Sequence, residues 1–151
     1  MSFPAHIPFV SLLGFELVRM AGGEAEIALA LRPELHNSFD VAHGGVCMTL
    51  LDVTMAQAAR SLNADLPNFG PGVVTVEMKT AFMRPGEGRL RALGRVLHRS
   101  TTLAFCEARV VDGSDRLVAH ATGTFKYLSA LPTGGRRSKA LQPRLEGPGS
   151  D

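Results

Sequence analysis

Apolar and polar residues alternate along about five segments of the chain, and this period of two predicts β-strands. In residues 24–31, Ala25, Ile27 and Leu29 lie on one face while Glu24 and Glu26 lie on the other. The other four segments are residues 73–83, 89–99, 102–112 and 116–127. Short turn sequences rich in Pro, Gly, Ser, Thr and Asp separate them, so we expect antiparallel pairing in one sheet of about five strands.

A helical segment from Gly44 to about Leu62 is apolar on nearly every face. A helix of this kind is covered by other structure rather than lying on a surface. The sheet must therefore curl around it, and a second subunit covers what the sheet leaves open. Long strands also leave edges that need pairing, which again favours a dimer. Residues 7–13 are expected to form a short helix or an ordered arm.

The length of 151 residues suits a single domain, which we place at residues 1–128. Residues 129–151 are rich in Pro, Gly, Ser and basic residues, and we expect this tail to be disordered. The formal net charge of +2 arises in the tail, so the body is neutral and a nucleic-acid partner is not expected.

The two cysteines, Cys47 and Cys106, lie far apart in the sequence and form no C-x-x-C motif. Buried free thiols in a reducing compartment are therefore expected. The uncharged residues 7–15 follow no basic segment and are interrupted by Pro8 and Gly14, so they predict neither a signal peptide nor a membrane span. We therefore expect a cytoplasmic protein.

Candidate chemistry lies where a polar loop ends at His43-Gly44-Gly45 and the apolar helix begins. Free backbone N–H groups and the positive end of the helix dipole at such a start can hold an oxyanion. The helix also contains the acid Asp52, with no basic residue three or four positions away. Asp52 is a candidate nucleophile or general base, and the alternative is a carboxylate paired with an arginine or capping another element.

These residues resemble a known family. His36-Asn37, His43-Gly44-Gly45 and Leu51-Asp52, with residues 72–78 and 82–86, resemble the signature of the hotdog-fold acyl-CoA thioesterases of the phenylacetate-pathway (PaaI) type. The resemblance covers roughly residues 12–127 and implies an α+β hotdog fold, in which an antiparallel sheet wraps around one long central helix. It departs from the family at Asp40, where the family has Gly; Asp tolerates a left-handed backbone better than most residues.

The resemblance also implies roles for individual residues. The Gly44 N–H and the Asn37 amide would polarise the thioester carbonyl, Asp52 would activate water or attack directly, and Thr75 would place the water. Read without the family, Asn37 is a turn residue and Thr75 an ordinary strand residue on the same alternating face as Glu77.

Further residues are candidate substrate contacts. His43 contacts substrate or orders the helix start, and Gly45 lies beside it. Thr101 and Thr102 resemble a region that touches the pantetheine arm, and Arg84 is a candidate for the coenzyme A phosphates. The arginines 89, 91, 95 and 99 share one strand face, which is typical of a solvated surface.

His36, Asp40 and His43 are residue types that can ligate zinc, but they lack a fourth ligand and a standard spacing. We therefore expect no metal, and no cofactor other than coenzyme A as part of the substrate.

The spacing of Gly44 and Asp52 has a consequence for assembly. Eight residues of helix separate them by roughly 12 Å. Because reacting groups must come within roughly 3–3.5 Å, each active site would combine Gly44 of one subunit with Asp52 of another. We expect a homodimer with sites at its interface, and a tetramer built as a dimer of dimers.

The expected activity is hydrolysis of an acyl-CoA, or a related acyl thioester, to a carboxylic acid and a free thiol. Two alternatives remain on the same fold. One is a non-catalytic acyl-CoA binding or sensing protein, and the other is a dehydratase or hydratase.

Overall fold

The computed structural model describes residues 1–133 and 138–144. The helices are α1 (Pro8–Leu13) and α2 (Gly44–Ser61), with 3-10 turns η1 (Pro33–Leu35) and η2 (Pro67–Phe69). The strands, in chain order, are β1 (Glu16–Ala21), β2 (Glu24–Ala30), β3 (Gly72–Phe82), β4 (Arg89–Arg99), β5 (Leu103–Val111), β6 (Leu117–Leu128), β7 (Ala130–Pro132) and β8 (Ser138–Ala140).

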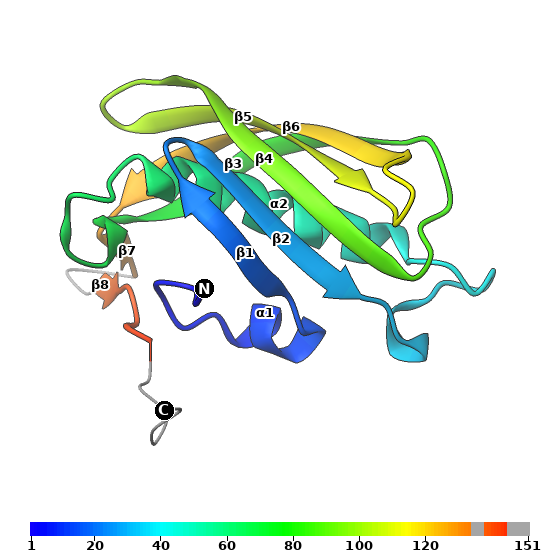
Figure 1. Ribbon diagram of the computed structural model, residues 1–151. Helices are drawn as coiled ribbons and strands as arrows, with labels where there is room; N and C mark the ends of the chain where they lie inside the picture. Colours follow the sequence, from blue (N-terminus) through cyan, green and yellow to red (C-terminus); the bar gives the residue numbers. More distant parts are fainter. Residues whose placement is uncertain (134–137, 145–151) are drawn as a thin grey trace.

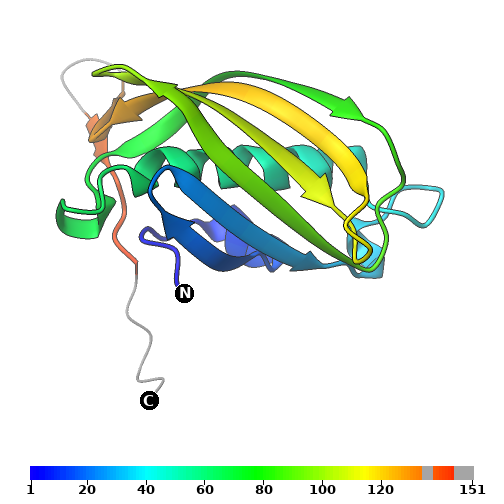
Figure 2. The same ribbon diagram turned by 45° about the horizontal axis from the view of Figure 1, so that its top comes forward.

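Strands β1 to β6 form one antiparallel six-stranded sheet in the order β1-β2-β4-β5-β6-β3. The sheet curls around α2, as Figures 1 and 2 show. The expected hotdog arrangement is confirmed. Strands β1 and β3 are the two edges of the sheet, so each leaves one row of backbone groups without a strand partner in the described chain.

The strand count is a correction, because the sequence predicted about five strands and missed β1. The pairing of β1 with β2 shifts register between Leu17 and Arg19. This β-bulge separates the buried residues Leu17 and Met20 by three positions, so the alternation that marks the other strands is lost.

Helix α2 packs into the concave face of the sheet. Leu50, Leu51 and Met55 are fully buried, as the apolar pattern predicted. Gly94 of β4 allows a close approach, because a Cβ there would lie 3.2 Å from the Thr54 carbonyl oxygen. One stripe of the helix stays partly or fully exposed, and we call it the open stripe: Gly45, Met48, Thr49, Asp52 and Ala56.

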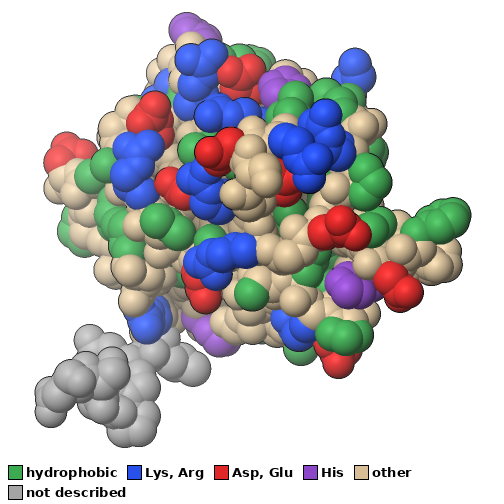
Figure 3. Space-filling model, turned by 45° about the vertical axis from the view of Figure 1, so that its right-hand side comes forward, with side chains coloured by type: hydrophobic (Ala, Val, Ile, Leu, Met, Phe, Trp, Pro, Cys, Tyr) green, Lys and Arg blue, Asp and Glu red, His purple; other side chains and the backbone are tan. Residues whose placement is uncertain are grey.

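Basic and acidic side chains are interspersed over the outer surface of the molecule in Figure 3. Arg89 pairs with Glu16, Arg91 with Glu26 and Arg95 with Glu107. A register shift between Val96 and His98 removes Arg99 from this row, so the four arginines do not share one face. Arg99 instead donates to Asn63 Oδ1 at 2.8 Å and lies 4.5 Å from the centre of the Tyr127 ring.

The chain continues past β6, which ends at Leu128, where the domain boundary was expected. In the segment expected to be disordered, β7 and β8 pair as a hairpin, while residues 134–137 and 145–151 lie outside the described residues. Beyond β8, Leu141 packs against Gly72, and the Gln142 carbonyl accepts a hydrogen bond from the His6 N–H. The C-terminal segment therefore reaches from the start of β3 to the N-terminal arm.

Cys47 and Cys106 are both buried free thiols, as expected. Burial raises the pKa of Cys47 to about 11 and that of Cys106 to about 12. Among the described residues, the helices fall short of the length and apolar character that a membrane span requires.

Candidate active site

The loop before α2 holds Asn37 in a defined orientation. Its Oδ1 accepts hydrogen bonds from the N–H groups of Phe39, at 2.8 Å, and Val41, at 3.4 Å. Asp40 has φ of 59°, so it adopts the left-handed conformation expected at this position. Because the carbonyl side of the Asn37 amide is used by the turn, its Nδ2 is left as a donor with no partner in the described chain.

The first turn of α2 leaves one particular N–H group unpaired. His43 is the N-cap, and its Nδ1 accepts a hydrogen bond from the Gly45 N–H at 2.9 Å. The N–H groups of Val46 and Cys47 donate to the His43 carbonyl. Gly44 N–H donates to none of the described residues, so it is the free donor at the positive end of the helix dipole.

Asn37 and Gly44 line the same cleft, which we call the loop cleft. It lies between residues 37–42 and the turn from β3 to β4, and has a volume of about 680 Å³. Most of its other lining side chains are apolar, among them Phe39, Val41, Cys47, Phe82, Met83, Pro85 and Val118. The cleft thus combines two hydrogen-bond donors with an apolar wall.

Asp52 lies in a second hollow, which we call the acid hollow. Its Oδ1 accepts a hydrogen bond from the Thr75 hydroxyl at 2.6 Å, and Met48, Thr49 and Met78 complete a space of about 210 Å³. Burial raises the pKa of Asp52, and the hydrogen bond from Thr75 offsets part of that rise. The described residues provide no ion pair to this carboxylate, so pairing with an arginine does not explain it.

A β-bulge directs Thr75 toward Asp52. Thr75 pairs with Phe125, whereas Glu77 pairs with Thr124, so Val76 is an extra residue in β3. Phe125 is buried against the helix side, while Glu77 accepts a hydrogen bond from the Thr124 hydroxyl. Thr75 and Glu77 therefore point to opposite faces, which corrects the expectation that they share one. Bulges commonly reorient side chains in this way next to active sites.

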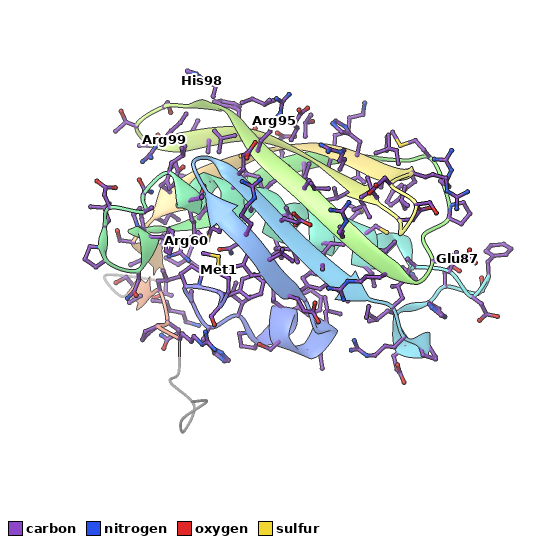
Figure 4. The ribbon with its side chains drawn as sticks, in the orientation of Figure 1. Met1, Arg60, Glu87, Arg95, His98 and Arg99 are labelled. Carbon is purple, nitrogen blue, oxygen red and sulfur yellow. The ribbon has the colours of Figure 1, made fainter. Side chains whose placement is uncertain are left out.

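Of the remaining predicted residues, Arg84 lies at the loop cleft, whereas Thr101 and Thr102 line neither hollow. Arg84 lines the loop cleft and donates to the Leu117 carbonyl at 2.9 Å. Thr101 and Thr102 lie in the turn from β4 to β5, and the Thr102 carbonyl accepts from the N–H of Tyr127, which pairs with Val73 near the start of β3. In Figure 4, Glu87 of the loop cleft and the pair His98 and Arg99 beside this turn lie at opposite ends of the sheet.

Some predicted residues take positions with a structural role. His43 orders the start of α2, because its Nδ1 accepts a hydrogen bond from the Gly45 N–H. The Gly45 N–H is therefore already paired within the chain. His36 forms an isolated bridge with Ala42 at the base of the loop. Within residues 1–133 and 138–144, no group of three His, Cys, Asp or Glu side chains is arranged to hold a metal ion.

The sequence did not identify the apolar residues that shape the two hollows. Phe39 is 83% exposed, and Phe82 and Met83 are each 53% exposed beside the loop cleft. In the sequence, these residues stand out only as large apolar side chains in a polar loop or at a strand end. Such residues are also common on surfaces without a function, so the pattern did not identify them.

Comparison with known proteins gives consistent results. The profile of the thioesterase superfamily matches residues 39–119. The structure of a conserved protein from Pseudomonas aeruginosa is 35% identical, with a TM-score of 0.75 over 83% of this chain and 97% of that chain. A mutant structure of the phenylacetic acid degradation protein PaaI from Thermus thermophilus is 31% identical, with a TM-score of 0.70 over 81% of this chain and all (100%) of that chain. The medium/long-chain acyl-CoA thioesterase YigI of Escherichia coli is 25% identical over 82% of this chain and 87% of its own.

Proposed function

The chain belongs to the thioesterase superfamily and is a thioester hydrolase, and on this premise we propose that it cleaves an acyl-CoA, or a related acyl thioester, to a carboxylic acid and a free thiol. The observation that carries the proposal is the hydrogen bond of 2.6 Å from the Thr75 hydroxyl to Asp52. Asp52 lies in α2, and the N–H group of the first residue of that helix is free. An anionic oxygen in the acid hollow and unpaired donors in the loop cleft are what thioester hydrolysis requires.

The loop cleft polarises the substrate. The thioester carbonyl oxygen accepts hydrogen bonds from Gly44 N–H and Asn37 Nδ2, and the helix dipole adds to the stabilisation of the negative charge that develops there. The acyl chain lies against the apolar wall formed by Phe82, Met83 and their neighbours, and the thiol side carries the coenzyme A moiety. Arg84 at the cleft and Thr101 and Thr102 in the turn from β4 to β5 are candidate contacts for that moiety.

Asp52 supplies the base or the nucleophile. As a base, it takes a proton from water, whose oxygen attacks the carbonyl carbon; the C–S bond breaks and the proton passes to the leaving thiolate. As a nucleophile, it attacks the carbon itself, expels the thiolate and forms an acyl anhydride that water then hydrolyses. In both cases the Thr75 hydroxyl holds the reactive carboxylate in place, and no metal or redox cofactor takes part.

The complete site requires two subunits. Gly44 and Asp52 belong to one continuous helix and line separate hollows, so they are about 12 Å apart along its axis. Asp52 of one subunit faces Gly44 of the other when two α2 helices pack side by side through their open stripes. A homodimer thus has two composite sites, and two such dimers form the proposed tetramer.

The edge strand β3 supports this dimer. It is 11 residues long and has β6 as its only strand partner in the described chain. Val76 and Phe82 in β3, Met83 just after it and Met48 on the open stripe are exposed apolar residues. When two copies of the same strand edge meet about a two-fold axis, they pair antiparallel, which extends the sheet and covers these side chains.

A thiol-release assay over short, long and aromatic acyl-CoAs tests the activity. We expect turnover by the natural chain and a loss of about a hundredfold or more in Asp52→Asn, because a general base contributes rate factors of that order. Tight coenzyme A binding without turnover of any thioester would instead favour the non-catalytic binding protein. Hydration or dehydration of an acyl-CoA without thiol release would favour the hydratase.

Mixing two inactive variants tests the composite site. Asp52→Asn and Asn37→Ala each damage both sites of a homodimer, but their heterodimer contains one site with both groups intact. We expect mixing and subunit exchange to restore activity. A fully active monomer, or no recovery in verified heterodimers, contradicts the shared site.

A further inference from the structure

The composite site fixes the alignment of the two β3 strands. Within one subunit, Asp52 accepts a hydrogen bond from Thr75 of β3. Gly44 lies against Phe82 at the other end of β3, because a Cβ at Gly44 would be 3.5 Å from the Phe82 ring. Bringing Asp52 of one subunit to the Gly44 donor of the other therefore brings Thr75 beside the partner's Phe82. In antiparallel pairing, each step back along one strand is a step forward along the other, so Val73 comes next to the partner's Arg84 and Gly72 next to the partner's Pro85, just beyond the end of its β3.

The start of β3 is where the C-terminal segment packs. Residues 72–74, Leu128, β7, β8 and Leu141 surround a hollow of about 740 Å³, which we call the hairpin hollow. Leu141 contacts Gly72, with 3.0 Å between its Cδ1 and the position of a Cβ there. Leu131 and Leu141 both line this hollow and remain 46% and 43% exposed, so two large apolar side chains stay only partly covered within the described chain.

These two observations place the hairpin hollow of one subunit next to the loop cleft of the other. The residues that line the loop cleft include 82–87, and the alignment sets the partner's residues 72–74 alongside their beginning. We propose that the C-terminal segment 130–132 and 138–141 forms the outer wall of the partner's acyl-binding cleft, and that Leu131 and Leu141 contact the far end of a long acyl chain. This inference rests on the proposed composite site.

The chemistry of the joined hollows favours a long aliphatic chain. Phe82 and Met83 lie on one side of the join, and Val74, Leu131 and Leu141 lie on the other. A short acyl group ends within the loop cleft, close to Gly44 and Asn37, and does not reach the hairpin. A long chain passes Pro85 of the same cleft and buries its end against the two leucines of the other subunit, which adds binding free energy in proportion to the apolar area covered.

Cross-linking tests the placement without relying on activity. Leu131→Cys and Met83→Cys, made in separate chains and mixed, should give a covalent dimer with a short bifunctional thiol reagent. Cys47 and Cys106 are buried, so the introduced thiols are the reactive ones. Leu12→Cys mixed with Met83→Cys is the control, since Leu12 is exposed on α1, away from β3.

Chain-length selectivity tests the role. We expect Leu131→Ser to lower kcat/KM for hexadecanoyl-CoA about tenfold and to leave butanoyl-CoA unchanged, while Leu12→Ser changes neither. A dimer that hydrolyses acyl-CoA but gives no cross-link between positions 131 and 83, or equal chain-length profiles for the two serine variants, overturns this inference alone. A chain with no thioesterase activity overturns the proposed function instead.

Discussion

The hydrogen bond between Thr75 and Asp52 opposes the effect of burial on one carboxyl group. Burial raises the pKa of Asp52 and the Thr75 hydroxyl lowers it, so the group's ionisation depends on a single neighbour. Because the ionised carboxylate is the active form in both proposed mechanisms, we expect the balance between these two effects to set the acidic limit of activity.

Replacing Thr75 by Val should shift that limit. Without the hydroxyl, the pKa of Asp52 rises further, so the acid limb of kcat/KM against pH moves to higher pH. Thr75→Ser keeps the hydroxyl and should stay close to the natural profile. A limb that does not move, or moves to lower pH, would show that Thr75 does not tune this carboxylate.

Asp52→Asn should lower activity, and its effect on the free energy of unfolding should depend on pH. The folded pKa of Asp52 lies above the unfolded value of 3.8, so the folded state binds more protons in the interval between them and loses stability as pH rises through it. The amide does not titrate and its oxygen still accepts from Thr75. The free energy of unfolding of the variant relative to the natural chain should therefore be higher at pH 7 than below pH 3.8, as denaturant titrations at both pH values can measure.

Residue types and spacing were sufficient to identify Gly44 and Asp52 as candidates, whereas Asn37 became a candidate only through the resemblance to the family. A free N–H at a helix start and an acid without a helical partner are local features, and both are present in the structure. Phe39, Met83 and the other apolar lining residues were not identifiable, because a cleft is made by segments that meet only in the fold. His43 illustrates the intermediate case, since its cap bond to Gly45 was one of two alternatives that the sequence left open.

At the level of elements, bulges account for where the strand predictions failed. Regular alternation correctly located β2 to β6, and the continuous apolar pattern located α2. Extra residues in β1, β3 and β4 shift the period by one, which hid β1, reversed Glu77 relative to Thr75 and removed Arg99 from the outer row. The irregularity in β3 brings Thr75 to Asp52, and the one in β4 precedes Arg99, which contacts Asn63 and Tyr127. Alternation therefore fails where the backbone places a particular side chain.

The contact between α2 and β4 depends on a missing side chain. Gly94→Ala places a methyl group 3.0 Å from Thr54 Cγ2 and 3.2 Å from the Thr54 carbonyl oxygen, so the helix or the strand must shift. We expect a loss of about 1–3 kcal/mol in the free energy of unfolding, as for other overpacked cores. Gly113→Ala, where a Cβ has nothing within 4 Å, is the control for thermal or denaturant unfolding and should be close to neutral.

For the molecule as a whole, the proposed dimer depends on one edge strand of the sheet, β3. A charge on β3 should prevent dimer formation, because strand pairing would bury it without a partner. We expect Val76→Asp to give a monomer in light scattering and to lose nearly all activity. Val18→Asp is the matched control, a similarly exposed valine on the opposite edge strand β1, and it should leave both mass and activity unchanged. An active Val76→Asp monomer would be incompatible with the shared site.

The sequence predicted the curled sheet and the buried helix, and both are present. The second subunit, inferred from a helix too apolar for one sheet face to cover, stays a prediction. The sequence did not predict the pairing of β7 with β8 or the return of Leu141 to Gly72. These contacts join segments with weak local patterns, and their stability comes from packing against residues about 70 positions away.

The rigid separation of Gly44 and Asp52 on one helix also has a consequence for inheritance. In the proposed homodimer, a chain carrying Asp52→Asn and Asn37→Ala together, paired with a natural chain, would contribute one damaged half to each of the two composite sites. Neither site of that heterodimer would be complete, so such a chain would silence its natural partner. The same two lesions on different chains leave one site whole. In a cell that makes both forms, the doubly altered gene would be dominant, whereas two singly altered genes would complement each other.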